Sequence, residues 1–277
     1  MSRELRLRIV SGIILAIVVL AATWCGGLAF RLLASVIALL VYYEWSTITG
    51  LHGRDPQGNA IAWLGLAAIA AATLAEEPVY AVAALCLFVL VTAILVAARR
   101  KSWWLPGGVL YAGLTCIALS EIRDDDFRGF AVMLFVFATV WATDIFAYFV
   151  GRAIGGAKLA PRISPGKTWS GAIGGAVAAV IAGSAVVWYF FLGTGLWVAG
   201  VALLLSICSQ AGDLFESFIK RRFGVKDSSH LIPGHGGVMD RVDGLIFACF
   251  AAFLLAIVLS LATDGETVSL GGVLLGV

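Results

Sequence analysis

The stretch VYAVAALCLFVLVTAILVAA, residues 79–98, runs for 20 residues without a charged side chain. At about 1.5 Å of helical rise per residue, it is long enough to cross the hydrocarbon core of a bilayer. Glu76 and Glu77 come shortly before it, and Arg99, Arg100 and Lys101 follow it. Because cytoplasmic loops collect Lys and Arg, the stretch predicts a transmembrane helix whose C-terminal end faces the cytoplasm.

The composition of the whole chain agrees with this prediction. Hydrophobic residues make up 61% of the 277 and charged residues 13%, and the mean hydropathy is +0.99. These values exclude an ordinary soluble domain. The five cysteines are scattered through apolar runs, without the spacing of a disulfide framework or a metal site. A net charge of only +2 gives no reason to expect a nucleic-acid partner.

Further apolar runs predict an all-α polytopic membrane protein with about nine transmembrane helices. We expect these helices at residues 9–25, 28–47, 58–75, 79–98, 104–120, 129–150, 171–192, 195–218 and 241–262. The third and fifth runs are the weakest, and hydropathy alone also allows eight spans. We divide this single membrane unit into N-terminal helices, residues 1–125, and C-terminal helices, residues 126–277.

Charge in the connections indicates the orientation of these helices. With the N-terminus in the cytoplasm, all but three of the 19 Lys and Arg residues fall into cytoplasmic segments. The exceptions are Arg31, Arg123 and Arg128, whereas acidic residues gather on the opposite side. We therefore expect a cytoplasmic N-terminus and a C-terminus outside.

Residues 144–171 form the first polar region, which begins inside the predicted helix 129–150. Asp144, Tyr148 and Arg152 recur at every fourth residue and so share one stripe of that helix. An ionisable group inside a transmembrane helix destabilises the protein unless it faces protein, water or an ion. Asp144 is therefore a candidate site residue; the alternative is an internal ion pair with Arg152 or a lysine that only holds helices together.

The run ISPGKTWSG, residues 163–171, resembles a phosphate-binding loop only in part. That motif requires a glycine where this chain has Pro161, and a preceding strand. A lysine, hydroxyl groups and backbone N–H groups ahead of a helix still suit phosphate oxygens. Ser164, Lys167 and Thr168 are thus candidates for binding substrate phosphates; the alternative is a loop that is merely positive because it faces the cytoplasm.

Residues 210–244 form the second and denser polar region. Around the end of the predicted helix 195–218, one face carries Asp213, Glu216, Ser217 and Lys220. At the start of the predicted helix 241–262, Asp240 and Asp243 share a face. A glycine-rich turn separates the two groups and allows their carboxylates to converge.

Carboxylates mixed with cations at this density indicate phosphate chemistry. Mg²⁺ prefers carboxylate oxygens and typically uses one or two of them together with substrate phosphates. Zinc fits less well, because only His230 and His235 offer nitrogen ligands and no cysteine is near. The alternative is a structural cluster of ion pairs at the helix ends.

The segment SFIKRRFGVKDSSHLIPGHGGVMDRVD, residues 217–243, resembles the signature of the phosphatidate cytidylyltransferase family, also called CDP-diacylglycerol synthases. The matching positions are Ser217, Lys220, Arg221, Lys226, Asp227, Pro233, His235, Gly236, Gly237, Asp240, Arg241 and Asp243. The upstream segments around Asp144 and Lys167 also resemble the family. One departure is Ser170, which stands where an acidic residue is expected.

The resemblance implies that CTP and phosphatidic acid react to give CDP-diacylglycerol and pyrophosphate, with Mg²⁺ as cofactor; a second cation is left open. It implies Asp213 and Asp240 as the main metal ligands, with Asp243, Asp144 and Glu216 as additions. The residues expected to act on the phosphates are Lys220, Arg221, Lys226, His235 and Arg241. The residues expected to bind substrate are Ser164, Lys167, Thr168, Ser217 and Tyr148. For His235, a contact to pyrophosphate and a role in bracing the Gly-Gly turn both remain open.

The resemblance also implies a bacterial-type inner (plasma) membrane, with membrane lipid as a partner and the site on the cytoplasmic side. A homodimer is left open. Two rival functions are less well supported by the residues. A secondary transporter usually shows inverted repeats and polar residues near the middle of the membrane, and no internal repeat is found here. The alcohol phosphotransferases that consume CDP-diacylglycerol carry an Asp-Gly-x-x-Ala-Arg pattern, which this sequence lacks.

Overall fold

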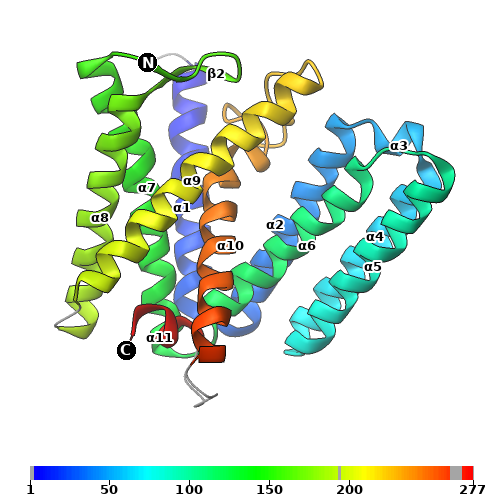
Figure 1. Cartoon of the computed structure of the whole chain (residues 1–277), viewed down its shortest axis with the longest axis horizontal. Coiled ribbons are helices and arrows are strands. Elements are labelled where there is room, and N and C mark those ends of the chain that lie inside the picture. Colours follow the sequence, from blue (N-terminus) through cyan, green and yellow to red (C-terminus); the bar gives the residue numbers. More distant parts are fainter. Residues whose placement is uncertain (1–2, 193–194, 263–269, 277) are drawn as a thin grey trace. The chain divides into compact units, whose positions relative to one another are not determined.

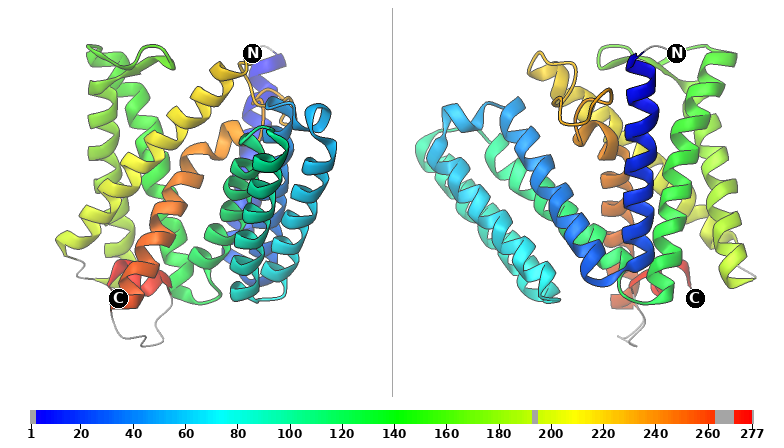
Figure 2. Two further views of the ribbon diagram at one scale, coloured as in Figure 1. Left: turned by 45° about the vertical axis from the view of Figure 1, so that its right-hand side comes forward. Right: turned by 180° about the vertical axis from the view of Figure 1, so that it is seen from behind.

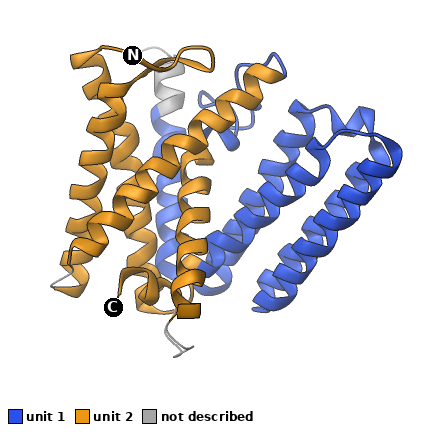
Figure 3. Ribbon diagram, in the orientation of Figure 1, with its two compact units in different colours: residues 1–121, 223–241 blue, residues 122–222, 242–277 orange. Residues whose placement is uncertain are grey.

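The computed structural model describes residues 3–192, 195–262 and 270–276, with side chains described from residue 9 onward. The contacts of the chain divide it into two compact units (Figure 3). Unit 1 contains Met1–Glu121 and Phe223–Arg241, and unit 2 contains Ile122–Arg222 and Val242–Val277. The signature segment therefore groups mostly with the N-terminal helices. The predicted division at residue 126 was drawn along the sequence and stays a prediction.

Helices make up almost the whole of the described chain (Figure 1). The long helices are α1 (Arg3–Cys25), α2 (Gly27–Ile48), α4 (Pro56–Leu74), α5 (Pro78–Arg99), α6 (Trp104–Arg123), α7 (Phe127–Ile154), α8 (Trp169–Phe191), α9 (Leu196–Arg222) and α10 (Met239–Ala262). Two short helices are α3 (Leu51–Arg54) and α11 (Leu270–Leu275). Each of the nine predicted helices is present, and the ends differ from the prediction by a few residues.

The prediction of an all-α polytopic membrane protein is confirmed. Within the described residues, eight helices are long and apolar enough to cross a membrane. The remaining long helix, α1, contributes a shorter apolar run, Ile9–Cys25. These helices agree with both numbers of membrane-spanning helices that hydropathy allows, eight and nine.

Three helices begin at side chains that accept a hydrogen bond from the first turn. Asp55 Oδ1 accepts from Gly58 N at the start of α4, at 3.2 Å. Asp126 Oδ1 accepts from Gly129 N at the start of α7, at 2.6 Å. Thr168 Oγ1 caps α8 in the same way. Such caps satisfy backbone N–H groups that have no partner inside the helix, which fixes where each helix begins.

Unit 1 packs α2, α4, α5 and α6 around buried aromatic side chains. Trp45 Nε1 of α2 donates to the carbonyl of Trp104 at 2.8 Å, and the Trp45 ring stacks on Tyr111 of α6. Gly108 of α6 lies directly against the Trp45 ring, where a side chain would not fit. Helices α4 and α5 lie side by side in all views (Figure 2). The indole N–H finds a partner, as buried tryptophans require.

Unit 2 packs α7, α8 and α9 through small residues. A side chain on Gly171 or Gly175 of α8 would collide with the backbone carbonyls of Ala147 or Thr143 on α7. These glycines therefore serve packing, which drives helix association where lipid removes the hydrophobic effect. The Thr143 hydroxyl also donates to Ser206 Oγ of α9 at 2.8 Å.

A short β-hairpin in the connection between α7 and α8 was missed by the sequence analysis. Strands β1 (Lys158–Ala160) and β2 (Ser164–Thr168) pair antiparallel. Strands this short leave almost no periodic pattern in a sequence, and Gly155 and Gly156 ahead of them favour an irregular loop. The hairpin ends where α8 begins, so it places Lys167 and Thr168 at the N-terminus of that helix.

Candidate active site

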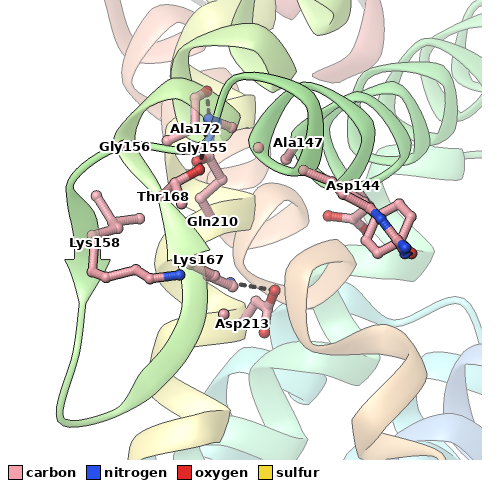
Figure 4. A pocket seen from close by; sticks show the side chains of 16 residues that line it. Asp144, Ala147, Gly155, Gly156, Lys158, Lys167, Thr168, Ala172, Gln210 and Asp213 are labelled. Atoms are coloured by element: carbon pink, nitrogen blue, oxygen red, sulfur yellow. Dashed lines mark hydrogen bonds and ion pairs between the residues drawn. The ribbon is translucent and has the colours of Figure 1, made fainter.

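Three charged side chains from three elements of unit 2 meet at one cavity. Lys167, at the end of β2, forms an ion pair with Asp213 of α9 (Figure 4). Asp144 of α7 lines the same cavity, and its carboxylate interacts electrostatically with both Asp213 and Lys167. The two carboxylates repel each other, and the positive charge of Lys167 offsets that repulsion. The positively charged side chain of Lys167, which the sequence predicts to bind substrate phosphates, thus lies in this cavity.

The cavity has a volume of about 520 Å³. Its polar lining comprises Asp144, Tyr148, Arg152, Lys158, Lys167, Thr168, Gln210 and Asp213. Glycines from the α7 end, the hairpin and α8 also line the space. The lining therefore combines cations and carboxylates, and cations of this kind bind phosphates.

A glycine brings a third carboxylate to this region. A side chain on Gly212 of α9 would lie 2.5 Å from the carbonyl oxygen of Asp243 on α10. Only glycine allows the two helices to approach this closely. The charges of Asp213, Asp144 and Lys220 all act on the Asp243 carboxylate, and the Gly244 N–H donates to its Oδ1 at 2.9 Å. Of the carboxylates predicted to converge, Asp213 and Asp243 therefore lie near each other within unit 2, and Asp144 of α7 joins them.

Tyr148 and Arg152 form a pair of their own. The Arg152 guanidinium donates to the Tyr148 hydroxyl at 2.8 Å, across one turn of α7. Among the described residues, no ion pair joins Arg152 to Asp144, although that pair was one alternative for the stripe. The stripe therefore presents a carboxylate and a tyrosine–arginine pair to the same cavity.

The hydroxyl residues around Lys167 have mostly structural contacts. Thr168 Oγ1 accepts from Gly171 N at 3.1 Å and so caps α8. Ser170, the departure from the family pattern, donates its hydroxyl to the Gly155 carbonyl and lies 3.1 Å from Thr168 Oγ1. Ser164 lies at the other end of β2 and does not line the cavity. Ser170 ties the hairpin connection to α8 without a charge.

The end of α9 carries the next group of predicted residues. Lys220 pairs with Glu216 at 2.5 Å, one turn apart on the same helix face. Glu216 is 1% exposed, so its charge is held inside the unit by this lysine. Ser217 and Arg221 lie on the same helix, where Arg221 is exposed. Neither of these two residues lines the Asp144–Asp213 cavity.

Residues 223–241 of unit 1, here called the signature loop, fold around a second, basic cavity. Its volume is about 660 Å³. The residues that line it are Lys226, Asp227, His230, Ile232, Pro233, Gly234, His235, Gly236 and Arg241. Three of the five residues predicted to act on the phosphates therefore share one cavity. Gly236 has a φ of 87°, a conformation that favours glycine, in the tight turn closed by the hydrogen bond from Ile232 N to its carbonyl.

His235 is held by α1. Its Nδ1 lies 2.8 Å from the Ser11 hydroxyl, which also contacts the Pro233 carbonyl at 3.1 Å. The Arg241 guanidinium donates to the His235 carbonyl at 3.1 Å. These contacts brace the turn, which was one of the two roles predicted for His235, and Ser11 is a contributor that the sequence analysis missed.

Asp240 organises the signature loop from the first turn of α10. Its Oδ2 accepts from the Ser228 N–H at 2.9 Å, the Ser228 hydroxyl at 2.8 Å and the Gly237 N–H at 2.8 Å. Asp240 and Asp213 belong to different units, so their predicted sharing of one metal ion stays a prediction. A second loop-binding carboxylate, Glu44 of α2, was also missed; its only sequence signal is that it is the one acidic residue of an apolar helix.

The carboxylates of unit 2 fit Mg²⁺ better than a metal held by protein alone. No three Asp, Glu, His or Cys side chains lie close enough to hold a metal ion among the described residues. Mg²⁺ needs only one or two carboxylates when substrate phosphates and water supply the other ligands. Asp213 and Asp144, with Asp243 nearby, provide such an incomplete oxygen set facing a cavity.

Comparisons with known proteins cover nearly the whole chain. The family described as the cytidylyltransferase family matches residues 6–259. The phosphatidate cytidylyltransferase of Brucella abortus biovar 1 (strain 9-941) is 44% identical over 253 residues, which are 91% of this chain and 93% of that protein. The phosphatidate cytidylyltransferase of Staphylococcus aureus (strain COL) is 33% identical over 252 residues, covering 88% of this chain and 95% of that protein.

Proposed function

The chain belongs to the cytidylyltransferase family, and on this premise we propose that it transfers the cytidylyl group of CTP to phosphatidic acid. A phosphate oxygen of phosphatidic acid attacks the α-phosphorus of CTP, and the bond from that phosphorus to the bridging β-phosphate oxygen breaks. CDP-diacylglycerol forms and pyrophosphate leaves. The lipid phosphate is already an anion at neutral pH, so the attack needs no strong general base. The main barrier is bringing two anions together.

The observation that carries the proposal is the cavity lined by Asp144, Lys167 and Asp213, in which Lys167 forms an ion pair with Asp213. We assign Mg²⁺ to Asp213 and Asp144, with substrate phosphates and water as the other ligands, and Asp243 and Asp240 stay predicted ligands. Bound there, Mg²⁺ would neutralise charge on the reacting phosphates. A divalent cation bound to Asp213 would replace Lys167 as its ion-pair partner. The Lys167 ammonium group would then be available to contact a phosphate oxygen. Fixed charges of this kind lower the barrier because they need no reorganisation during the reaction.

The basic cavity of the signature loop is assigned to the triphosphate of CTP. Lys226, His235 and Arg241 line it. Lys220 and Arg221, at the end of α9 in unit 2, also stay predicted to act on the phosphates. Cations at a departing pyrophosphate stabilise the charge that develops on it. Asp227 lines the same cavity beside Lys226 and is assigned to orienting that lysine.

An apolar groove between α8 and α9 is assigned to an acyl chain of phosphatidic acid. Its volume is about 720 Å³, and its lining is almost entirely aliphatic, with Trp169 and Gln210 at its edge. Leu159, Ala172 and Gln210 line both this groove and the Asp144–Asp213 cavity. The apolar groove therefore adjoins the charged cavity, an arrangement that matches a phosphate headgroup joined to a hydrocarbon chain.

Filling the groove should act selectively on long-chain substrate. Ala176→Trp adds a large ring to the lining and is expected to lower the rate with dioleoyl phosphatidic acid roughly tenfold. The rate with water-soluble dihexanoyl phosphatidic acid should change little, because its short chains need less of the groove. Ala185→Trp, at an exposed α8 position outside the lining, is the control. Equal losses with both substrates would contradict the assignment of the groove.

The proposed orientation places the N-terminus and the hairpin in the cytoplasm, where CTP is available, at a bacterial-type plasma membrane. A reporter inserted at Arg162, in the exposed turn between β1 and β2, is expected on the cytoplasmic side. Reporters fused after Val277 or inserted at Glu77 are expected on the other side, because the loops that hold the cations face the cytoplasm. Accessibility labelling of the three fusions in intact cells measures this. Finding Arg162 and Val277 on the same side would contradict the nine-span arrangement.

The test of the function itself is a direct assay. Detergent-purified protein, supplied with CTP, Mg²⁺ and phosphatidic acid, should release pyrophosphate and form CDP-diacylglycerol in equal amounts. Omitting phosphatidic acid should abolish pyrophosphate release. Pyrophosphate release that does not depend on the lipid, or none at all from folded protein, would contradict the proposed function.

A further inference from the structure

Glu44 is a buried carboxylate in α2, far in sequence from every residue assigned to the reaction. It is 0% exposed and lies in an otherwise largely apolar helix. A charged group in this environment destabilises the protein strongly unless hydrogen bonds satisfy its oxygens.

Four donors from the signature loop surround Glu44. Its Oε1 accepts from the Ser229 hydroxyl at 2.5 Å and from the Val238 N–H at 2.8 Å. Its Oε2 accepts from the Ser228 hydroxyl at 3.1 Å and from the Met239 N–H at 2.6 Å. Two of these donors are backbone groups, so Glu44 fixes the path of the chain as well as two side chains.

Glu44 and Asp240 hold the loop together. The Ser228 hydroxyl lies within hydrogen-bond distance of both carboxylates. Between them lies Gly237, where any side chain would collide with Ser228 Oγ and Glu44 Oε1. The glycine is therefore required because the two carboxylates close around the backbone at this point. Two residues near this point in the sequence line the basic cavity, His235 before Gly237 and Arg241 after Asp240.

We infer that Glu44 is a positioning residue of the reaction: it fixes the backbone of the signature loop so that Lys226, His235 and Arg241 face one cavity. This inference rests on the proposed function only for the ligand of that cavity, the CTP triphosphate. A glutamate is needed because two oxygens must accept four donors. Glutamine offers one acceptor oxygen, and its NH₂ group would face N–H or hydroxyl donors.

Glu44→Gln should therefore loosen the loop and weaken CTP binding. Hydrogen–deuterium exchange of a peptide that contains Val238 and Met239 should become about tenfold faster or more. The KM for CTP should rise about tenfold, because lost hydrogen bonds to a charged group weaken the arrangement of the cavity. The KM for phosphatidic acid should stay within about threefold, since the unit 2 cavity is untouched.

Thr49→Val is the matched control. Thr49 is also buried in unit 1, directly after α2, and its hydroxyl donates to the Trp45 carbonyl at 2.6 Å without touching the signature loop. This variant should lower the melting temperature but leave loop exchange and the KM for CTP unchanged. A merely structural role for Glu44 predicts that Glu44→Gln behaves like Thr49→Val, and that result would overturn the inference.

Ser229→Ala covers the case in which Glu44→Gln does not fold. It removes a single donor to Glu44 Oε1 from a half-buried residue, and it should change exchange and the KM for CTP in the same direction by about two- to fivefold. Unchanged exchange in this variant would overturn the inference. The exchange measurement needs no substrate, so it tests Glu44 even if the wild-type protein fails to release pyrophosphate, which would contradict the proposed function instead.

Discussion

Asp213→Asn is expected to reduce the release of pyrophosphate by roughly 10³-fold, as expected for losing a fixed charge at the reacting centre. Asparagine keeps the shape of the side chain but removes the charge that pairs with Lys167 and that we assign to Mg²⁺. Asp213 lines a cavity and lies on a helix face packed by its neighbours, so solubilised yield and thermal stability should change little. Initial rates over a range of Mg²⁺ concentrations measure the effect.

Asp125→Asn is the control for Asp213→Asn. It removes an exposed carboxylate between α6 and α7, in the same unit but outside the cavity. Its rate should equal that of the unchanged protein. If Asp213→Asn kept near-normal turnover at ordinary Mg²⁺, Asp213 would be only an ion-pair partner of Lys167, and the metal assignment would be wrong.

Asp240→Asn is expected to lower turnover by roughly 10²- to 10³-fold. The Asn carbonyl oxygen can still accept the three donors that Ser228 and Gly237 give to Asp240 Oδ2, so the signature loop should keep its fold. If Asp213 and Asp240 share one metal ion, the double variant should be scarcely slower than either single variant, because groups acting as one unit are not additive. Steady-state rates of the four proteins measure this.

Losses that simply multiply would contradict the shared metal. Asp240 would then act only by organising the signature loop. In that case Asp240→Asn should resemble Glu44→Gln, with a raised KM for CTP and faster exchange around Val238, while Asp213→Asn should affect kcat alone.

The helices could be predicted closely because apolar runs of bilayer length have few other interpretations. Residues 79–98 were expected as a span and form the body of α5 (Pro78–Arg99). The ends are less predictable, because caps decide them. The helix predicted at 129–150 extends over Phe127–Ile154, since Asp126 caps its start and its last turn carries Tyr148 and Arg152 beyond the apolar run.

The candidate site was predictable where spacing along a helix decides which residues share a face. Asp144, Tyr148 and Arg152 share one stripe of α7 and line one cavity, as their spacing indicated. That Asp213 and Lys167 line the same cavity did not follow from spacing, because these residues lie on other elements. Contacts between distant segments left no such signal. Glu44 accepts from four donors that lie 184 to 195 residues later in the sequence. Gly212 allows α10 to approach α9 closely, and the sequence of α9 alone does not indicate this contact. The Thr168 hydroxyl was expected at a phosphate, but it accepts from the Gly171 N–H and caps α8.

The long separation between Glu44 and its donors has a consequence for biosynthesis. At about 5 to 20 residues per second, the ribosome makes Val238 and Met239 about 10 to 40 s after it makes Glu44. Helix α2 must therefore leave the translation machinery with a carboxylate whose partners do not yet exist. The nascent chain can complete unit 1 only after most of unit 2 has been synthesised, because Phe223–Arg241 comes last. A truncated chain that ends before Met239 would thus contain α2 without the donors of Glu44. We expect quality-control proteases to degrade such a chain.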